Sequence, residues 1–140
     1  MSVFYLASPI DNANKQTYYL RKELITGLDT RGHTVFDPAS AWGGVSPTCD
    51  NQTSDKVTTA NNAMIHLLDG VVALLPPDCR TIGTIYEIIM AKAAQKFTVV
   101  FAPGLRPSVV LNSLAIPYYT QLQEVLYAID EHTARQAVEQ

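Results

Sequence analysis

Short apolar runs alternate along the chain with longer segments in which apolar residues recur every three or four positions. The short runs have the length of buried strands, and the longer segments have the spacing of amphipathic helices. Turn-forming residues such as Ser8-Pro9 and Asp37-Pro38 end the runs. Strands are therefore predicted at residues 3–7, 33–36, 70–75, 96–101 and 116–119, and helices at residues 12–31, 54–68, 84–95, 108–114 and 120–140.

The alternation of strand and helix along the whole chain indicates a parallel sheet with helices on both faces. With 140 residues, the chain has the length of one domain with a substantial core. We therefore expect a single α/β domain over residues 1–140: a flavodoxin-like or Rossmann-like three-layer sandwich with about five parallel strands. A long connection rich in Gly, Ser, Pro and Asn, from residue 39 to about 53, interrupts this pattern and is more often functional than idle.

The most distinctive polar segment is Thr81-Ile82-Gly83-Thr84-Ile85-Tyr86-Glu87, which follows the third predicted strand. It places Glu87 in the first turn of a helix at the carboxyl edge of the sheet, where ligands bind in open α/β folds. Backbone N–H groups and the helix dipole there would keep the carboxylate ionised, as a nucleophile at a sugar carbon requires. Thr84-x-x-Glu87 is also the pattern of a capping box, and its spacing alone favours that structural role.

Composition narrows the classes of partner. The net charge is −3, and the 10 Lys and Arg residues are scattered without forming a basic stripe, which disfavours binding to nucleic acid. No apolar stretch reaches the ~18 residues that span a bilayer, so a membrane is not expected as a partner. The first residues lack a basic segment followed by a long apolar run, so they do not form a signal peptide, and the cytoplasm is the expected location.

Several common catalytic motifs are absent. There is no GxGxxG after the first strand, no GxxxxGK[ST] and no GxSxG. The histidines are far apart in sequence, and neither Cys49 nor Cys79 has metal-ligand spacing or belongs to a CxxC pair. No metal and no organic cofactor is therefore expected, which leaves chemistry by carboxylate and hydroxyl groups.

Four segments, in their order and spacing, resemble the nucleoside 2-deoxyribosyltransferase family. They are Phe4-Tyr5-Leu6-Ala7-Ser8-Pro9, Asn61-Asn62-Ala63-Met64-Ile65 leading to Asp69-Gly70-Val71-Val72, Gly83-Thr84-Ile85-Tyr86-Glu87-Ile88, and Val110-Leu111-Asn112-Ser113. The similarity extends from residue 3 to about residue 114. No one segment is specific, so the expectation depends on the four together.

The resemblance implies roles for individual residues. It makes Glu87 the nucleophile and Tyr5 the group beside it that orients the carboxylate. It places Asn61 close to the sugar or the leaving base, and it brings Asn112 from a neighbouring subunit to the 5′-hydroxyl, which implies a homo-oligomer. Each residue also has an ordinary structural explanation: a core aromatic for Tyr5, a polar helix face for Asn61, and a helix cap or surface position for Asn112.

Other positions bear on the substrate. Many of these transferases have an Asp that contacts the base where this chain has Thr81, whereas related deoxynucleoside 5′-monophosphate N-hydrolases have a hydroxyl residue that helps to hold phosphate. Those hydrolases usually have serines where this chain has Pro9 and Asn112, which favours an uncharged 5′-hydroxyl. Trp42 is expected to stack on the nucleobase or to plug an apolar gap. Ser8 and Gly83, which belong to the matched segments, complete the predicted substrate-binding set.

The resemblance therefore predicts a nucleoside 2′-deoxyribosyltransferase whose small-molecule substrates are a 2′-deoxynucleoside and a free nucleobase. The predicted mechanism proceeds with retention through a covalent deoxyribosyl–Glu87 intermediate, in parallel with retaining glycosidases. Two alternatives remain open. One is an N-glycoside hydrolase of (deoxy)nucleosides or their 5′-monophosphates, and the other is a non-catalytic nucleotide-binding module in which Glu87 only caps a helix.

Overall fold

The predicted sheet is present, with every pairing parallel. A computed structural model describes residues 2–9, 14–42, 50–104 and 107–139 of the chain. In this part of the chain, five strands pair in the order β2-β1-β3-β4-β5, which is the flavodoxin-like strand order. The strands are β1 (Val3–Ala7), β2 (Thr34–Phe36), β3 (Gly70–Leu74), β4 (Phe97–Phe101) and β5 (Tyr118–Tyr119).

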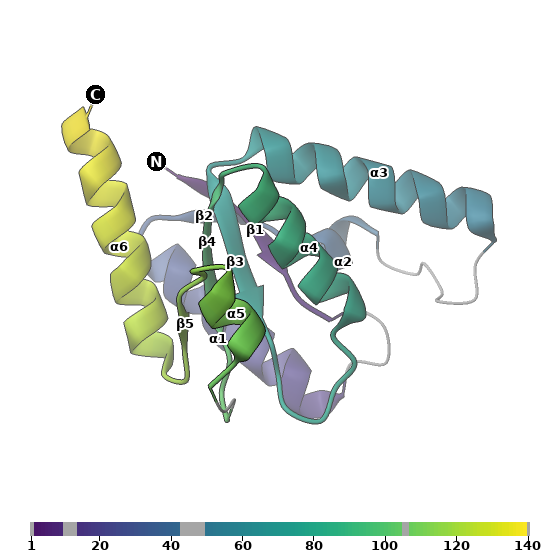
Figure 1. The fold of residues 1–140 in the computed structure, drawn as a ribbon, viewed down its shortest axis with the longest axis horizontal. Coiled ribbons are helices and arrows are strands. Elements are labelled where there is room, and N and C mark those ends of the chain that lie inside the picture. Colours follow the sequence, from purple (N-terminus) through teal and green to yellow (C-terminus); the bar gives the residue numbers. More distant parts are fainter. Residues whose placement is uncertain (1, 10–13, 43–49, 105–106, 140) are drawn as a thin grey trace.

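Helices cover both faces of this sheet (Figure 1). One face is packed by α1 (Lys15–Thr30) and α6 (Leu122–Glu139). The other face is packed by α3 (Asn51–Leu67), α4 (Ile82–Ala93) and α5 (Val109–Ser113). The expected single α/β domain with three layers is confirmed. Among the described residues, no helix is both long enough and apolar enough to cross a membrane.

Alternate residues of the central strands enter the two halves of the core. Along β1, Phe4 and Leu6 pack with α1 and α6, whereas Tyr5 and Ala7 pack with α3, α4 and α5. All residues of β3 are buried, as expected for a strand covered on both faces. Tyr5 is thus placed on the same face of the sheet as α4, the helix that carries Glu87.

The first half of the predicted long connection contains a helix that the sequence pattern did not predict. The short helix α2 (Pro38–Ala41) begins after Asp37, whose Oδ1 accepts a hydrogen bond from the Ala39 N–H at 3.0 Å. Pro38 suits the first position of a helix because its N–H would have had no helical partner. The helix α3 then begins at Asn51, earlier than the predicted residue 54, because Asp50 caps it.

Two glycines are required by the backbone. Gly32, after α1, has a φ of +80°, a conformation that side chains with a Cβ rarely adopt. Gly70 begins β3 so close to β4 that an added Cβ would lie 2.7 Å from the backbone oxygen of Phe97. These two residues allow the tight turn into β2 and the close approach of the two central strands.

Candidate active site

The side chains of Tyr5 and Glu87 meet in the structure. Tyr5 projects from β1 and Glu87 from α4, and the Tyr5 hydroxyl donates a short hydrogen bond to Oε2 of Glu87. Tyr5 is fully buried, and Glu87 is partly exposed. The contact joins residues 82 positions apart in the sequence. It leaves the second carboxylate oxygen of Glu87 without a bond to Tyr5.

Burial controls the ionisation of this pair. It raises the pKa of Glu87 to about 7, and the hydrogen bond from Tyr5 opposes this rise more weakly. Burial also raises the pKa of Tyr5 far above its ordinary value, and the negative charge of Glu87 adds to that effect. Tyr5 therefore remains a protonated donor, and Glu87 loses its proton near neutral pH.

The prediction that Glu87 lies in the first turn of a helix, where the helix dipole keeps it ionised, was wrong. The helix α4 begins at Ile82, so Glu87 lies a turn further along, where the backbone N–H groups already have helical partners. Desolvation is the largest influence on its pKa and acts in the opposite direction to the predicted one.

The capping box is also absent. The residue that precedes α4 is Thr81, and its side chain makes no capping hydrogen bond. The hydroxyl of Thr84 is buried, and among the described residues it has no hydrogen-bond partner. Glu87 instead accepts a bond from β1, so helix capping does not account for its position.

A buried ion pair lies beside Tyr5 at the carboxyl end of β2. Asp37 pairs with Arg21 of α1, and both side chains are mostly buried. The negative charge of Asp37 contributes to the raised pKa of Tyr5, and the ring of Phe36 packs against the ring of Tyr5 at 5.9 Å between centroids. The sequence analysis did not predict the Arg21–Asp37 pair. Asp37 does follow the second predicted strand, and this position already placed it at the carboxyl edge of the sheet, where Glu87 was expected.

Two adjacent amides of α3, Asn61 and Asn62, make hydrogen bonds near the helix that carries Glu87. Oδ1 of Asn61 accepts a hydrogen bond from the indole N–H of Trp42 at 2.9 Å. Nδ2 of Asn62 donates a hydrogen bond to the hydroxyl of Tyr86 at 3.2 Å, and Tyr86 is the residue that precedes Glu87. The structure thus joins the predicted residues Asn61 and Trp42 to each other, a contact that their spacing in the sequence did not suggest.

The remaining predicted residues are more scattered. Ser8 follows β1 and is buried, and its hydroxyl has no hydrogen-bond partner among the described residues. Gly83 is exposed in the first turn of α4, with open space around the position of a Cβ. Asn112 is exposed on α5, where its Oδ1 accepts a hydrogen bond from the Tyr118 hydroxyl at 3.1 Å. Asn112 is not the cap of α5, because Ser108 has that role.

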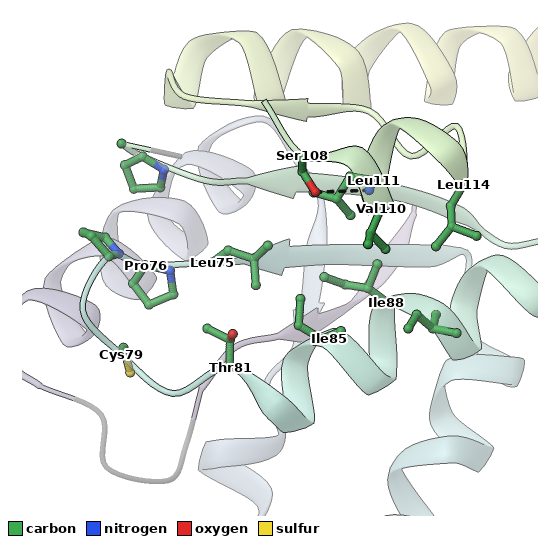
Figure 2. Close-up of a pocket in the computed structure, with 14 residues that line it drawn as sticks. Leu75, Pro76, Cys79, Thr81, Ile85, Ile88, Ser108, Val110, Leu111 and Leu114 are labelled. Atoms are coloured by element: carbon green, nitrogen blue, oxygen red, sulfur yellow. Dashed lines mark hydrogen bonds between the residues drawn. The ribbon is translucent and has the colours of Figure 1, made fainter. Parts of the chain in front are cut away.

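A cavity of about 400 Å³ lies between α4 and α5 (Figure 2). Ile85 and Ile88 of α4 line one side, Val110 and Leu111 of α5 line the other, and Thr81 stands at the end near the β3–α4 loop. Neither Tyr5 nor Glu87 lines this cavity, and its lining includes no carboxylate or histidine. We place the candidate active site at the Tyr5–Glu87 pair because that is where ionisable groups are buried together.

The described residues include no group of three or more His, Cys, Asp and Glu side chains close enough to hold a metal ion. His66 is exposed on α3, and Cys49 lies outside the described residues. The site offers the carboxylate of Glu87, whose pKa lies near neutral pH, and the phenol of Tyr5, which donates a hydrogen bond to it.

Several solved structures share this fold. A 2-deoxyribosyltransferase from Bacillus psychrosaccharolyticus superposes with a TM-score of 0.76 at 20% identity, covering 89% of this chain and 90% of that one. A CMP N-glycosidase from Clostridium botulinum gives 0.62 at 19% identity, covering 91% and 98%. A 2-deoxyribosyltransferase from Leishmania mexicana gives 0.66 at 15% identity, covering 94% and 99%. At these identities the likeness establishes the fold.

No curated protein sequence matches the chain significantly. The family model of nucleoside 2-deoxyribosyltransferases, however, matches residues 4–131, which include both Tyr5 and Glu87. The chain therefore belongs to the nucleoside 2-deoxyribosyltransferase family.

Proposed function

We propose that the protein is a nucleoside 2′-deoxyribosyltransferase, which exchanges the nucleobase of a 2′-deoxynucleoside through an ester between C1′ and Glu87. The observation that carries this proposal is the buried contact between Tyr5 and Glu87. A partly exposed carboxylate with one oxygen held by a phenol has the other oxygen available for attack. Family membership supports an activity on nucleosides, as a transferase or an N-glycosidase.

In the first step, the ionised carboxylate of Glu87 attacks C1′ while the bond between C1′ and the base nitrogen breaks. The electron pair of that bond leaves with the base. The transition state resembles an oxocarbenium ion, as in retaining glycosidases. Tyr5 orients the carboxylate through its hydrogen bond, which saves the entropy of fixing the nucleophile during reaction.

In the second step, the acceptor base attacks C1′ from the side that the first base vacated. The ester bond breaks, and the carboxylate of Glu87 returns to Tyr5. The proton that the acceptor base loses balances the one that the departing base gains, so neither is consumed. Two inversions at C1′ give net retention. Water in place of the acceptor base would give hydrolysis, so exclusion of water favours transfer.

The direct test is base exchange. Deoxyadenosine incubated with free cytosine should give deoxycytidine, and Glu87→Ala should abolish its formation. Glu87→Gln is the matched variant, because it keeps the size of the side chain and removes the nucleophilic charge. Near-wild-type exchange by either variant would contradict the mechanism. Absence of any glycosidic cleavage at high enzyme concentration would support a non-catalytic binding module instead.

Hydrolysis is the second candidate function, favoured by Thr81. Its hydroxyl lies at the N-terminus of α4 without a capping bond, and backbone N–H groups at a helix N-terminus favour anions such as a 5′-phosphate. The base-exchange assay separates the two functions, because free deoxyribose or its 5′-phosphate as the only sugar product would indicate a hydrolase. Comparing deoxynucleosides with their 5′-monophosphates identifies the substrate class.

We extend the proposal to a homo-oligomer in which Asn112 of one subunit reaches the site of another. Asn112 is exposed on α5, and its side-chain hydrogen bond is with Tyr118 and not with Tyr5 or Glu87 of its own chain. Large apolar side chains are exposed on the same two helices that flank the cavity: Ile82 at 80% and Ile89 at 44% on α4, and Val109 at 84% and Val110 at 57% on α5. Such exposure is typical of subunit contacts.

Light scattering after size exclusion measures this assembly. Val110→Asp should dissociate the oligomer and lower base exchange, because the neighbouring Asn112 would be withdrawn. Val138→Asp is the control, since Val138 is 86% exposed on α6, on the other face of the sheet. A wild-type protein that elutes as a monomer while active would contradict the shared site.

A further inference from the structure

The side chain of Trp42, the only tryptophan of the chain, is bonded to α3. Its indole N–H donates to Oδ1 of Asn61 at 2.9 Å. Its backbone N–H donates to the Pro38 oxygen at 2.8 Å, so the end of α2 holds the backbone from which the indole extends. The start of α2 is fixed in turn by the capping bond from the Ala39 N–H to Asp37. The indole therefore reaches Asn61 from a well-supported position.

This contact decides which way the carboxamide of Asn61 faces. An indole N–H can only donate, whereas a carboxamide has one accepting oxygen and an amino group that only donates. The oxygen therefore faces Trp42, and the amino group faces away from the indole. The two donors of that amino group are left for other partners.

The turn of α3 that carries Asn61 is also tied to the helix of the nucleophile. Asn62, the next residue, donates to the hydroxyl of Tyr86 at 3.2 Å, and Tyr86 directly precedes Glu87 on α4. This turn of α3 therefore lies against the turn of α4 that carries Glu87, and the carboxamide of Asn61 is held in rotation by Trp42. Both restraints act before any ligand binds.

We propose that Trp42 is a positioning residue, which holds Asn61 so that the amino group of its carboxamide is offered to the nucleoside. The inference rests on the proposed function at Glu87 and adds the feature that Asn61 selects: a lone pair on the base, such as a carbonyl oxygen or ring nitrogen. That atom gains negative charge as the base departs, so the hydrogen bond strengthens in the transition state. Trp42 then acts through Asn61 and not by stacking.

A double-mutant cycle tests this inference. Trp42→Phe keeps an aromatic ring but removes the indole N–H together with the rest of the five-membered ring, and it should lower kcat of base exchange about tenfold with little change in KM. In an Asn61→Ala background, Trp42→Phe should cost less than about twofold, because the group it positions is gone. Tyr127→Phe is the control, since Tyr127 is exposed on α6 and should be without effect.

Equal losses from Trp42→Phe in the two backgrounds would overturn the inference, as would an unchanged kcat in Trp42→Phe. An increase confined to KM would show that the ring contacts the base directly, which also overturns it. A purely structural role would lower the melting temperature of Trp42→Phe and leave the kcat of the folded enzyme unchanged.

A second measurement does not depend on catalysis. With one tryptophan in the chain, the ¹⁵N–¹H spectrum has a single indole resonance. Asn61→Ala should shift that resonance and speed its exchange with solvent, and Tyr127→Phe should leave it in place. An unmoved resonance in Asn61→Ala rejects the positioning contact. Absence of glycosidic cleavage by the wild-type protein rejects the proposed function, so the two failures are distinguishable.

Discussion

At the scale of single residues, the candidate active site is centred on the buried hydrogen bond between Tyr5 and Glu87. The sequence resemblance predicted that these two side chains lie together, and the structure confirms this contact, whereas their catalytic roles stay a prediction. It could not give their ionisation, because desolvation depends on side chains from separate elements that close around the carboxylate. A pattern of residues along one helix predicts a cap and a dipole, whereas the folded protein adds burial, which has the larger effect on the Glu87 pKa.

The activity should therefore depend on pH near neutrality. In the proposed mechanism only ionised Glu87 attacks C1′, so we expect kcat/KM to rise with pH through about 7 and then level. Tyr5→Phe removes a bond that lowers the Glu87 pKa, so the rise should move to higher pH, with a rate loss of roughly 10–100-fold at the plateau. Rate–pH profiles of both proteins measure this. A Tyr5→Phe profile that moves to lower pH would contradict the assignment.

The same group should make stability depend on pH. Its pKa is about 7 in the folded protein and near 4.5 when unfolded, so the folded state binds more protons between these values. The free energy of unfolding should fall as pH rises from about 4.5 through 7, with an effect of roughly 1–3 kcal/mol. Glu87→Gln should remove that part of the pH dependence. Urea titrations of the wild type and of Glu87→Gln at pH 5 and pH 8 measure this difference. If the free energy of unfolding changes equally between the two pH values in both proteins, the charge of Glu87 is not buried.

At the scale of elements, the start of α4 departs most from its sequence pattern. Thr84-x-x-Glu87 has the spacing of a capping box, yet Thr84 lies inside the helix and Glu87 turns to β1. Local spacing cannot distinguish these cases, because the competing partner of Glu87 comes from a distant strand. The short helix α2 was missed for a related reason, since its four residues are too few to show a period.

Thr84 provides a test of this correction. Its buried hydroxyl has no partner among the described residues, so Thr84→Val should raise the free energy of unfolding by about 1 kcal/mol. A working capping box would instead lose about 1 kcal/mol. Asn14→Ala is the comparison, because Asn14 does cap α1 by accepting from the Thr17 N–H at 2.8 Å. Urea denaturation of the wild type, Thr84→Val and Asn14→Ala measures these differences. A lower free energy of unfolding in Thr84→Val would show that Thr84 does act as a helix cap.

At the scale of the whole molecule, the sequence predicted the architecture well. Five apolar runs became five parallel strands, and the chain order of strands and helices set the layers. The sequence left the strand order open between flavodoxin-like and Rossmann-like, and it did not give the register, because both depend on which faces pack together. The close approach of β3 and β4 at Gly70 is one such feature, because nothing in the local sequence names Phe97 as its neighbour.

Substitution by alanine should lower stability at Gly70 and raise it at Gly83. Gly70→Ala places a Cβ 2.7 Å from the Phe97 backbone oxygen, so it should separate the central strands and cost at least about 2 kcal/mol of unfolding free energy. Gly83→Ala meets open space inside α4 and should stabilise the fold by about 0.5–1 kcal/mol. Thermal denaturation measures both. If Gly83→Ala is more stable but loses base exchange, the predicted contact between Gly83 and the substrate is supported. If Gly70→Ala is as stable as the wild type, the close packing of β3 against β4 at Gly70 is contradicted.

The path of the chain between Tyr5 and Glu87 has a practical consequence. One partner comes from the first strand and the other from a helix beyond the midpoint, and β1 must dock beside β3 before they meet. No contiguous fragment that lacks either segment can assemble the reactive pair. If the proposed mechanism holds, catalytic turnover reports completed folding, so regain of activity after dilution from denaturant should follow docking of the N-terminal strand and not the appearance of helices.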